Sequence, residues 1–188
     1  MARTPVIPDT AIPRGSARAF QHALDTYVSE TNKVADVWRR FEDADLAFRP
    51  HDRSSTVGEI MKHQLLSERR FFGEFLGLAE PPAAEMLPTP LTVAAAADRL
   101  ATLAVARLAP LAAADDAWWL ETVRFFDVDR ERAWIFWRRV LHTAHHRTQL
   151  TVYLRLLGRA VPAMYGPSGD ATWVGADPTT SVDAAARR

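Results

Sequence analysis

Apolar residues recur at helical spacing in four long segments of the chain. The segments run from about residue 16 to 41, from 55 to 77, from 92 to 109 and from 129 to 157. Because residues three and four apart lie on one face of a helix, each segment predicts a helix with an apolar side. Four such helices without a convincing set of strands predict an all-α fold, a four-helix bundle with irregular connections and extended termini.

Proline and glycine mark the ends of these predicted helices. Pro50 separates the first segment from the second, and Pro110 is expected to end the third, because proline lacks the N–H that continues a helix. Gly77 and Gly158 follow the second and fourth segments, where glycine commonly ends a helix. Between the third and fourth segments, residues 115–129 are compatible with either a short hairpin or a loop packed on the bundle.

The fourth segment is apolar around most of its circumference. It contains the run Trp134, Ile135, Phe136 and Trp137, followed by further apolar residues down to Leu156. A helix that is apolar on all sides is usually covered by its neighbours. We therefore expect this helix to be central in the bundle.

We expect one domain, from residue 16 to residue 170, between two looser ends. A chain of 188 residues has the usual length of one domain and can bury a hydrophobic core. Residues 1–15 contain three prolines and predict an extended N-terminal arm. Residues 171–188 are polar and alanine-rich and predict a C-terminal tail.

Composition argues against several kinds of function. The formal net charge is zero, which argues against nucleic acid as a partner, because binding to phosphates needs a basic surface. No run of about 18 apolar residues is present, so we expect no membrane span. The N-terminal residues lack a signal-like apolar core, so we expect a cytoplasmic protein. The absence of cysteine excludes disulfides, metal ligation by cysteine thiolates and a cysteine side chain as the nucleophile.

The histidines are the residues most able to carry chemistry. The sequence contains His22, His51, His63, His142, His145 and His146. His142 and His146 are four positions apart, so on a helix their rings can point at a common metal ion. His63 lies among apolar neighbours in the second predicted helix, and a facing helix is where a bundle takes its next ligand from. Paired histidines also occur on solvated helix faces, so spacing alone leaves a structural role open.

Four stretches of the chain carry motifs in a fixed order. They span residues 48–63, 68–72, 142–150 and 153–170, and include Phe48-Arg49-Pro50, a run that ends at His63, Phe71-Phe72, and His142-Thr143-Ala144-His145-His146-Arg147-Thr148-Gln149. In this order and spacing they resemble the DinB-like superfamily of metal-binding four-helix proteins, which includes metal-dependent thiol S-transferases. The resemblance covers roughly residues 16–170 and departs at Thr148, where the family usually has glycine.

The resemblance implies a metal site and an assembly. It implies His63, His142 and His146 as ligands of one divalent metal ion, the same three that helical spacing favours. It also implies a homodimer as the commonest assembly. Three imidazoles leave one coordination position open, as in catalytic sites. Zinc and nickel suit imidazole ligands, and iron or manganese are the alternatives.

Two classes of function fit such a site. One is a metal-dependent enzyme acting on a small molecule, either a transferase of low-molecular-weight thiols or a hydrolase. The other is a non-catalytic metal-binding protein of stress response or interaction, which the missing His-Glu-x-x-His base motif favours. Glu59, Glu68 and Glu121 could act as bases but are more typical of structural acids. Arg147 is expected to pair with an acid on a neighbouring helix, and Gln149 could steady a ligand ring.

Overall fold

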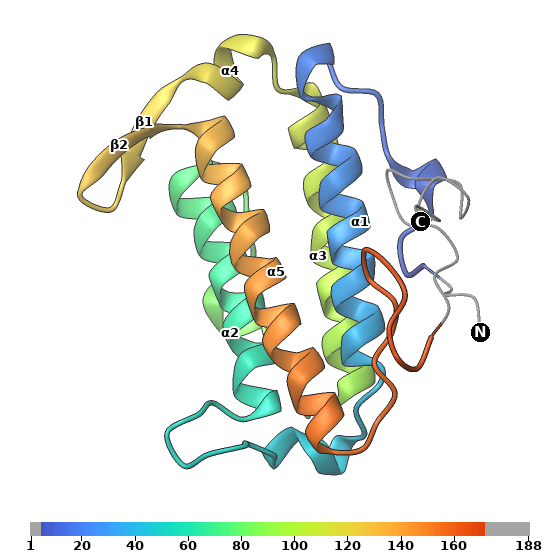
Figure 1. Ribbon diagram of the computed structural model, residues 1–188. Helices are drawn as coiled ribbons and strands as arrows, with labels where there is room; N and C mark the ends of the chain where they lie inside the picture. The colour runs from blue at the N-terminus through green and yellow to red at the C-terminus, as the bar shows by residue number, and fades with distance from the viewer. Residues whose placement is uncertain (1–4, 172–188) are drawn as a thin grey trace.

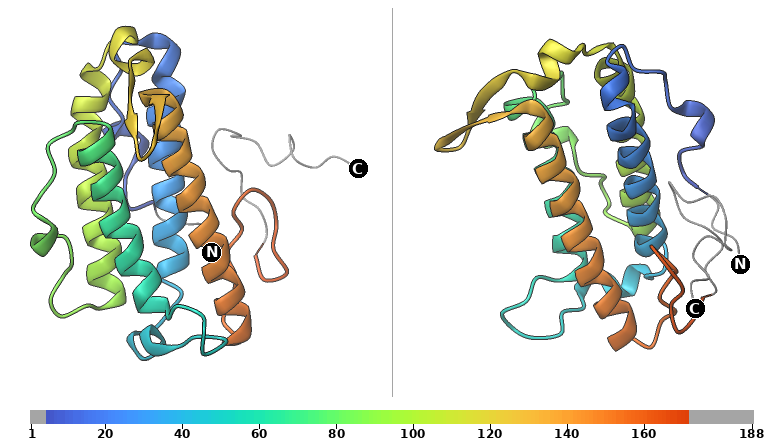
Figure 2. Two further views of the ribbon diagram at one scale, coloured as in Figure 1. Left: turned by 90° about the vertical axis from the view of Figure 1, so that its left-hand side faces the viewer. Right: turned by 45° about the horizontal axis from the view of Figure 1, so that its top comes forward.

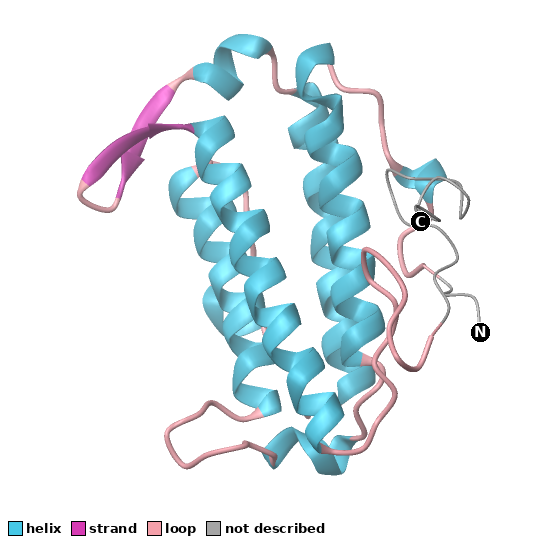
Figure 3. Ribbon diagram, in the orientation of Figure 1, coloured by secondary structure: helices cyan, strands magenta, loops and turns pink. Residues whose placement is uncertain are grey.

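The computed structural model describes residues 5–171 as a mostly helical chain with one small β-hairpin (Figures 1 and 3). Its α-helices and strands are α1 (Gln21–Trp38), α2 (Val57–Arg70), α3 (Val93–Ala113), α4 (Asp116–Leu120), β1 (Thr122–Phe125), β2 (Val128–Glu131) and α5 (Arg132–Leu156). Short 3₁₀ turns cover Asp9–Ala11, Arg18–Phe20, Asp43–Ala47 and Ala83–Glu85, and a π-helical turn covers Phe71–Phe75. The mostly helical class is confirmed, and the segment left open between a hairpin and a loop contains a two-stranded hairpin.

The four longer helices run side by side (Figures 1 and 2). α1 packs against α3 and α5, and α2 packs against α5 and α3. α4 and the hairpin connect α3 to α5 at the end of the molecule where α5 begins (Figure 1). Among residues 5–171, none of the helices combines the length and the apolar character that crossing a bilayer requires.

α5 is not enclosed by the other helices, which corrects the prediction of a central position. One side of it contacts α1 and α2, whereas Leu141, Val152 and Leu156 have side chains that are more than half exposed. Their spacing of eleven and four positions keeps these three within about 60° of one another around the helix. The apolar residues of α5 are therefore divided between the core and one exposed face.

α2 begins at a capping box formed by Thr56 and Glu59. The Glu59 N–H donates to Thr56 Oγ1 over 3.1 Å, and the Thr56 N–H donates to Glu59 Oε2 over 2.7 Å. These bonds satisfy N–H groups at the helix start that have no partner within the helix. The π-helical turn then extends α2 toward Gly77, whose φ of 76° ends the helix at the predicted residue.

α3 continues past Pro110 to Ala113, so the prediction that proline ends this helix was wrong. Pro110 lies in the last turn, where few backbone bonds remain to be lost. The next two residues, Leu111 and Ala112, are buried in the core. The Ala112 carbonyl also accepts a hydrogen bond from the N–H of Ser16 over 2.7 Å. Packing and this external partner hold the turn that the proline weakens.

The N-terminal arm is held against α1. The side chain of Ile7 is fully buried. The Ile7 N–H donates to Asn32 Oδ1 over 2.9 Å, and Asn32 Nδ2 donates to the Ile7 carbonyl over 2.8 Å. This paired contact fixes the arm on the helix at residue 7. The predicted C-terminal tail lies outside the described residues except for residue 171.

The hydrophobic core forms two clusters with buried charge between them. On α1 one cluster ends at Val28 and the other begins at Val34, and on α5 one ends at Val140 and the other begins at Leu150. The buried polar and charged side chains that fall between the clusters along α1, α2 and α5 are Ser29, Glu30, Thr31, Asn32, Lys33, Glu68, Thr143 and Arg147. Buried charges need partners, and each of the two acids in this layer is paired with lysine or arginine.

Candidate metal centre

Three histidine side chains on two facing helices converge on one point. His63 lies on α2, and His142 and His146 lie one turn apart on α5. The Nε2 atom of His142 is 3.3 Å from Nε2 of His63 and 3.2 Å from Nε2 of His146. One ring nitrogen from each residue can be chosen so that all three lie within 4.8 Å of one another. The structure thus brings together the three residues that the sequence favoured.

These separations fit a metal ion with imidazole ligands. Two nitrogens that bind zinc at about 2.0–2.1 Å in tetrahedral geometry lie about 3.3 Å apart. Among the described residues the group contains three histidines and no carboxylate. Such a donor set suits zinc and nickel and also iron. Three ligands leave a tetrahedral position for water or another small molecule.

The other three histidines are outside the converging group, although the His145 ring lies 5.0 Å from the ring of His146. The His22 ring stacks on Trp137 with the ring centroids 5.6 Å apart. The Nδ1 atom of His51 accepts a hydrogen bond from a backbone N–H two residues later, over 3.1 Å. His145 is exposed on α5, and its position is turned about 100° around the helix from that of His146. Within residues 5–171, none of the three joins the metal-capable group.

Burial lowers the pKa of all three converging rings. For His142, burial and then the positive charge of Arg139 lower the pKa from 6.5 to about 3. Burial is also the main reason that the pKa of His63 is lowered, followed by Arg139. For His146, burial outweighs the opposing hydrogen bond to Gln149 and lowers the pKa. The three rings are therefore uncharged at neutral pH, the form in which imidazole binds metals.

A chain of hydrogen bonds orients the His146 ring. Tyr153 OH donates to the Ser55 carbonyl over 3.2 Å, so its oxygen is free to accept from Gln149 Nε2 over 3.1 Å. The amide oxygen of Gln149 then faces His146 Nδ1 at 3.1 Å. An amide oxygen only accepts, so His146 donates from Nδ1. Its proton is thus held on Nδ1, which leaves the lone pair of Nε2 directed at the other two rings.

The His142 ring is held differently, by an arginine. Arg139 Nη1 lies 2.6 Å from His142 Nδ1, and Arg139 Nη2 donates to the Gln64 carbonyl over 3.0 Å and lies 3.6 Å from Glu68 Oε1. A guanidinium only donates, so Nδ1 of His142 accepts and the neutral ring carries its proton on Nε2. A metal can bind that Nε2 atom once Arg139 turns away and the proton moves to Nδ1.

The three acids considered as bases all have structural partners. Glu59 belongs to the capping box of α2, and Glu121 pairs with Arg132 at the start of α5. Glu68 is 2% exposed, and its Oε2 atom accepts a hydrogen bond from Arg107 Nη1 over 2.5 Å. These contacts support the structural interpretation of all three carboxylates.

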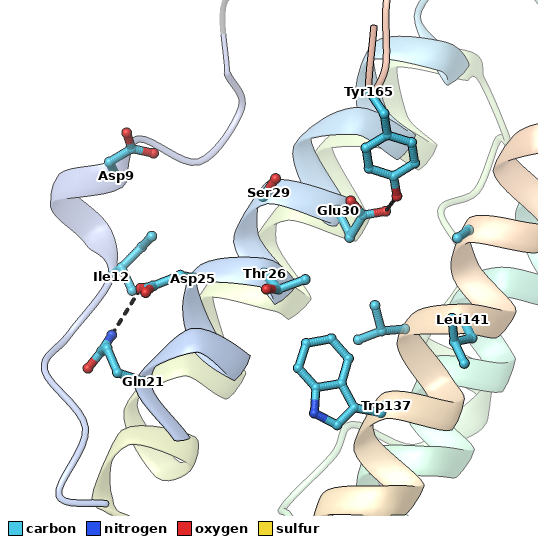
Figure 4. A pocket seen from close by; sticks show the side chains of 12 residues that line it. Asp9, Ile12, Gln21, Asp25, Thr26, Ser29, Glu30, Trp137, Leu141 and Tyr165 are labelled. Atoms are coloured by element: carbon cyan, nitrogen blue, oxygen red, sulfur yellow. Dashed lines mark hydrogen bonds between the residues drawn. The ribbon is translucent and has the colours of Figure 1, made fainter. Parts of the chain in front are cut away.

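Arg147 contacts α1 and the chain after α5 rather than the triad. It forms an ion pair with Glu30 of α1, as expected, and its Nη2 donates to the Tyr165 hydroxyl over 2.8 Å. Tyr165 in turn donates to Glu30 over 2.7 Å. Tyr165 and Glu30 border a cavity of about 610 Å³, with Trp137 and Leu141 of α5 on another wall (Figure 4). No histidine of the triad lines this cavity, so we treat it as separate from the candidate metal centre.

A second cavity, of about 550 Å³, lies beside the triad. It is lined by His63, Leu66, Ser67, Arg70, Phe71, Phe125, Phe126, Arg138 and His142. The segment that the sequence left open between hairpin and loop is in part a hairpin, with Phe125 opposite Val128, and it supplies two of these side chains. Sequence reasoning missed the two phenylalanines and both arginines. Arg138 had a signal, because it precedes His142 by one helical turn.

A model of the DinB family matches residues 16–173. The chain belongs to the DinB family. A DinB-like protein from Bacillus cereus ATCC 10987 is structurally similar, with a TM-score of 0.65 and 22% identity, covering 76% of this chain and 95% of that one. A DinB-like protein from Bacillus subtilis gives a TM-score of 0.60 and 19% identity, covering 74% of this chain and 93% of that one. The DinB-like fold is thereby confirmed, whereas a search of curated proteins gave no match.

The position at which this chain departs from the DinB-family motif does not disturb the triad. Thr148 stands where the family usually has glycine, and it is exposed on α5. The adjacent residue, Gln149, still contacts His146. The threonine therefore leaves the ligand-bearing face of the helix in place.

Proposed function

We propose that this DinB-family protein binds one divalent metal ion through His63, His142 and His146. The observation that carries the proposal is the convergence of their Nε2 atoms, with separations of 3.2 and 3.3 Å from His142. The lowered pKa values of all three rings add support, because they keep the imidazoles neutral. Zinc or nickel is the favoured ion, with iron or manganese as alternatives.

We further propose that the protein is an enzyme that transfers a low-molecular-weight thiol to a small electrophile. A divalent ion bound to three imidazoles lowers the pKa of a thiol or a water molecule that reaches its open position. The cavity beside the triad offers room for the reactants, and its phenylalanines exclude water from one side. His63 and His142 line that cavity, so an ion held by the three histidines would be accessible from it.

The residues around the cavity favour thiol transfer over hydrolysis. Among the described residues that line it, none is a carboxylate, so no side-chain acid stands ready as the general base that many metal-dependent hydrolases use. A thiol supplies its own nucleophile and needs only to lose a proton. Hydrolysis of a small ester or amide is therefore the second candidate.

Activity assays with matched histidine variants test the proposal. Zinc- and nickel-loaded protein would be assayed with cysteine, glutathione and coenzyme A as thiols and monobromobimane as electrophile, and with p-nitrophenyl acetate for hydrolysis. We expect thiol transfer that His63→Ala abolishes and that His145→Ala, which changes a histidine outside the triad, retains. Equal rates in wild type and His63→Ala would contradict the proposal.

A non-catalytic metal-binding role in stress response or interaction is the alternative. The structural partners of Glu59, Glu68 and Glu121 favour it, because they remove the candidate bases from the site. This alternative predicts that the metal-loaded protein binds small ligands but returns them unchanged. Conversion of any bound ligand to product at a rate that depends on His63 would rule it out.

We also propose a cytoplasmic homodimer. The exposed apolar face of α5, formed by Leu141, Val152 and Leu156, supports self-association, since such a face is usually covered in an assembly. Light scattering after size-exclusion chromatography would give the mass. We expect the wild type to be a dimer and Leu141→Glu to be a folded monomer. A wild-type protein that is monomeric at micromolar concentration would contradict the proposal.

A further inference from the structure

The cavity beside the triad carries positive charge without a matching acid. Its lining includes Arg70 and Arg138, and no carboxylate among residues 5–171 lines it. Arg70 is already occupied, because its Nε atom pairs with Glu74 over 2.9 Å and its guanidinium lies 4.9 Å from the ring centre of Phe126. Arg138 is exposed, and no hydrogen bond or ion pair engages it within the described part of the chain. Arg138 is thus a guanidinium free to bind an anion.

Three aromatic rings form the apolar wall of the same cavity. Phe71 and Phe125 are buried, with ring centroids 5.6 Å apart, and Phe126 is half-exposed. Flat apolar walls of this kind take up aromatic or extended apolar groups. A ligand that suits the cavity therefore combines an anionic end with an apolar body.

The backbone conformation at Phe126 supports a role for this ring in binding. Phe126 and Asp127 form the two-residue loop of the hairpin, and Phe126 has a φ of 52°. Glycine is the usual residue at a positive φ in such a loop, because a Cβ atom makes this conformation unfavourable. The ring is held against Phe75 at 4.8 Å and over Arg70. Strain of this kind is commonly kept where a side chain serves a binding site.

We propose that this cavity binds a small organic carboxylate with an aromatic or extended apolar body. The planar guanidinium of Arg138 pairs with the carboxylate, since its fork of donors matches two carboxylate oxygens. The body packs against Phe71, Phe125 and Phe126. The inference rests on the proposed function in one respect: the ligand is the electrophile or thiol carrier whose reactive atom faces His142 and the metal. A bound divalent cation adds to the positive field and strengthens the preference for anions.

Affinities of matched probes test the charge preference. Phenylacetate and its neutral isostere phenylacetamide would be titrated into zinc-loaded protein and into metal-free protein, with binding followed by ligand-observed NMR. We expect phenylacetate to bind at least ~10-fold more tightly than phenylacetamide, as one charge-assisted contact provides. In Arg138→Gln the ratio should fall at least about fivefold in both forms of the protein. Arg130→Gln, which removes an arginine from the neighbouring hairpin outside the cavity, should keep it.

The aromatic wall is tested with a second pair of probes. Phenylacetate should bind at least ~10-fold more tightly than acetate, and Phe126→Gly should reduce that advantage while relieving the strained loop. The inference would be overturned if Arg138→Gln kept the preference for phenylacetate over phenylacetamide. It would also be overturned if Phe126→Gly kept the preference for phenylacetate over acetate.

Metal content separates this inference from the proposed function. Elemental analysis of the same samples gives zinc per chain for the wild type and for each variant. If zinc binds but Arg138→Gln leaves the ratio of phenylacetate affinity to phenylacetamide affinity unchanged, the proposed ligand class is wrong and the metal site stands. If zinc does not bind but metal-free protein shows the Arg138-dependent preference, the proposed function fails and the carboxylate site stands.

Discussion

Replacing Glu68 with glutamine should destabilise the protein strongly and also weaken metal binding. Glu68 is 2% exposed and faces two buried arginines, with Oε2 at 2.5 Å from Arg107 and Oε1 at 3.6 Å from Arg139. Arg107 retains Glu80, to which it donates from Nε over 2.6 Å and from Nη2 over 2.7 Å. Arg139 retains no carboxylate within the described residues.

The magnitude follows from the second of these contacts. Two unit charges 3.6 Å apart attract each other by roughly 4–5 kcal/mol at an effective dielectric of about 20. Glutamine keeps the shape and still accepts a hydrogen bond, so part of the contact survives. Breaking buried ion pairs typically costs about 3–5 kcal/mol. We therefore expect Glu68→Gln to lower the free energy of unfolding by about 3 kcal/mol, a large share of the roughly 5–15 kcal/mol that a domain has.

The same substitution leaves the charge of Arg139 unbalanced beside His142. Arg139 already lowers the pKa of that ring, and an unbalanced cation would also repel a divalent ion. Changes to groups that support metal ligands usually cost about 10- to 100-fold in affinity. We expect the zinc affinity of Glu68→Gln to fall by at least about 10-fold.

Urea unfolding followed by circular dichroism would measure the loss of unfolding free energy in Glu68→Gln. The dependence of that free energy on urea concentration, the slope, would be compared between variants. The matched control is Glu74→Gln, which lies in the π-helical turn after α2 and breaks an ion pair with Arg70 whose side chains are about half exposed. Exposed pairs contribute about 1 kcal/mol or less. Equal losses in Glu68→Gln and Glu74→Gln, at an unchanged slope, would refute the argument for the buried charge layer.

Three further predictions concern acidity, a partly buried hydrogen bond and a buried ion pair. Metal-free protein should lose stability as the pH falls from about 6.5 toward 3, because His142 takes up a proton in the unfolded chain but has a folded pKa of about 3. His142→Gln should flatten this dependence in urea midpoints. Tyr153→Phe should weaken zinc binding about 10-fold in competition titrations, because Gln149 loses the hydroxyl that orients it. Arg147→Met should lower unfolding free energy by about 3 kcal/mol without changing zinc affinity, because its partner Glu30 lies on α1.

Each of these three predictions can be contradicted directly. An equally steep loss of stability with acid in His142→Gln would assign the pH dependence to other groups. Unchanged zinc affinity in Tyr153→Phe would mean that the hydrogen-bond chain does not orient the histidine ring. A loss of zinc-binding free energy in Arg147→Met as large as its loss of unfolding free energy would place Arg147 in the metal site.

The convergence of the three histidines could be predicted from sequence because part of it is local. The spacing of His142 and His146 within one helix places both rings on one face whatever the rest of the chain does. His63 required the further argument that a facing helix supplies the third ligand, together with the family resemblance. The helix ends at Gly77 and Gly158 were also local, and both residues have positive φ in the structure.

The parts that could not be predicted depend on contacts between distant residues. α3 passes Pro110 because tertiary packing buries the residues that follow it, and propensity alone contains no such information. The contact between Arg139 and Glu68 joins α5 to α2, and the position of Phe126 depends on strand pairing. The short steps along one helix from Arg138 and Arg139 to His142, four and three residues, did leave a signal in the sequence.

Metal content per chain shows most directly whether His63, His142 and His146 hold a metal ion. Untagged wild-type protein and the His142→Ala/His146→Ala double variant would be analysed by elemental mass spectrometry, as purified and after reconstitution. We expect one divalent ion per wild-type chain and none in the double variant. A wild-type protein that takes up no zinc, nickel, iron or manganese after reconstitution would contradict this expectation and leave the three converging histidines with a structural role.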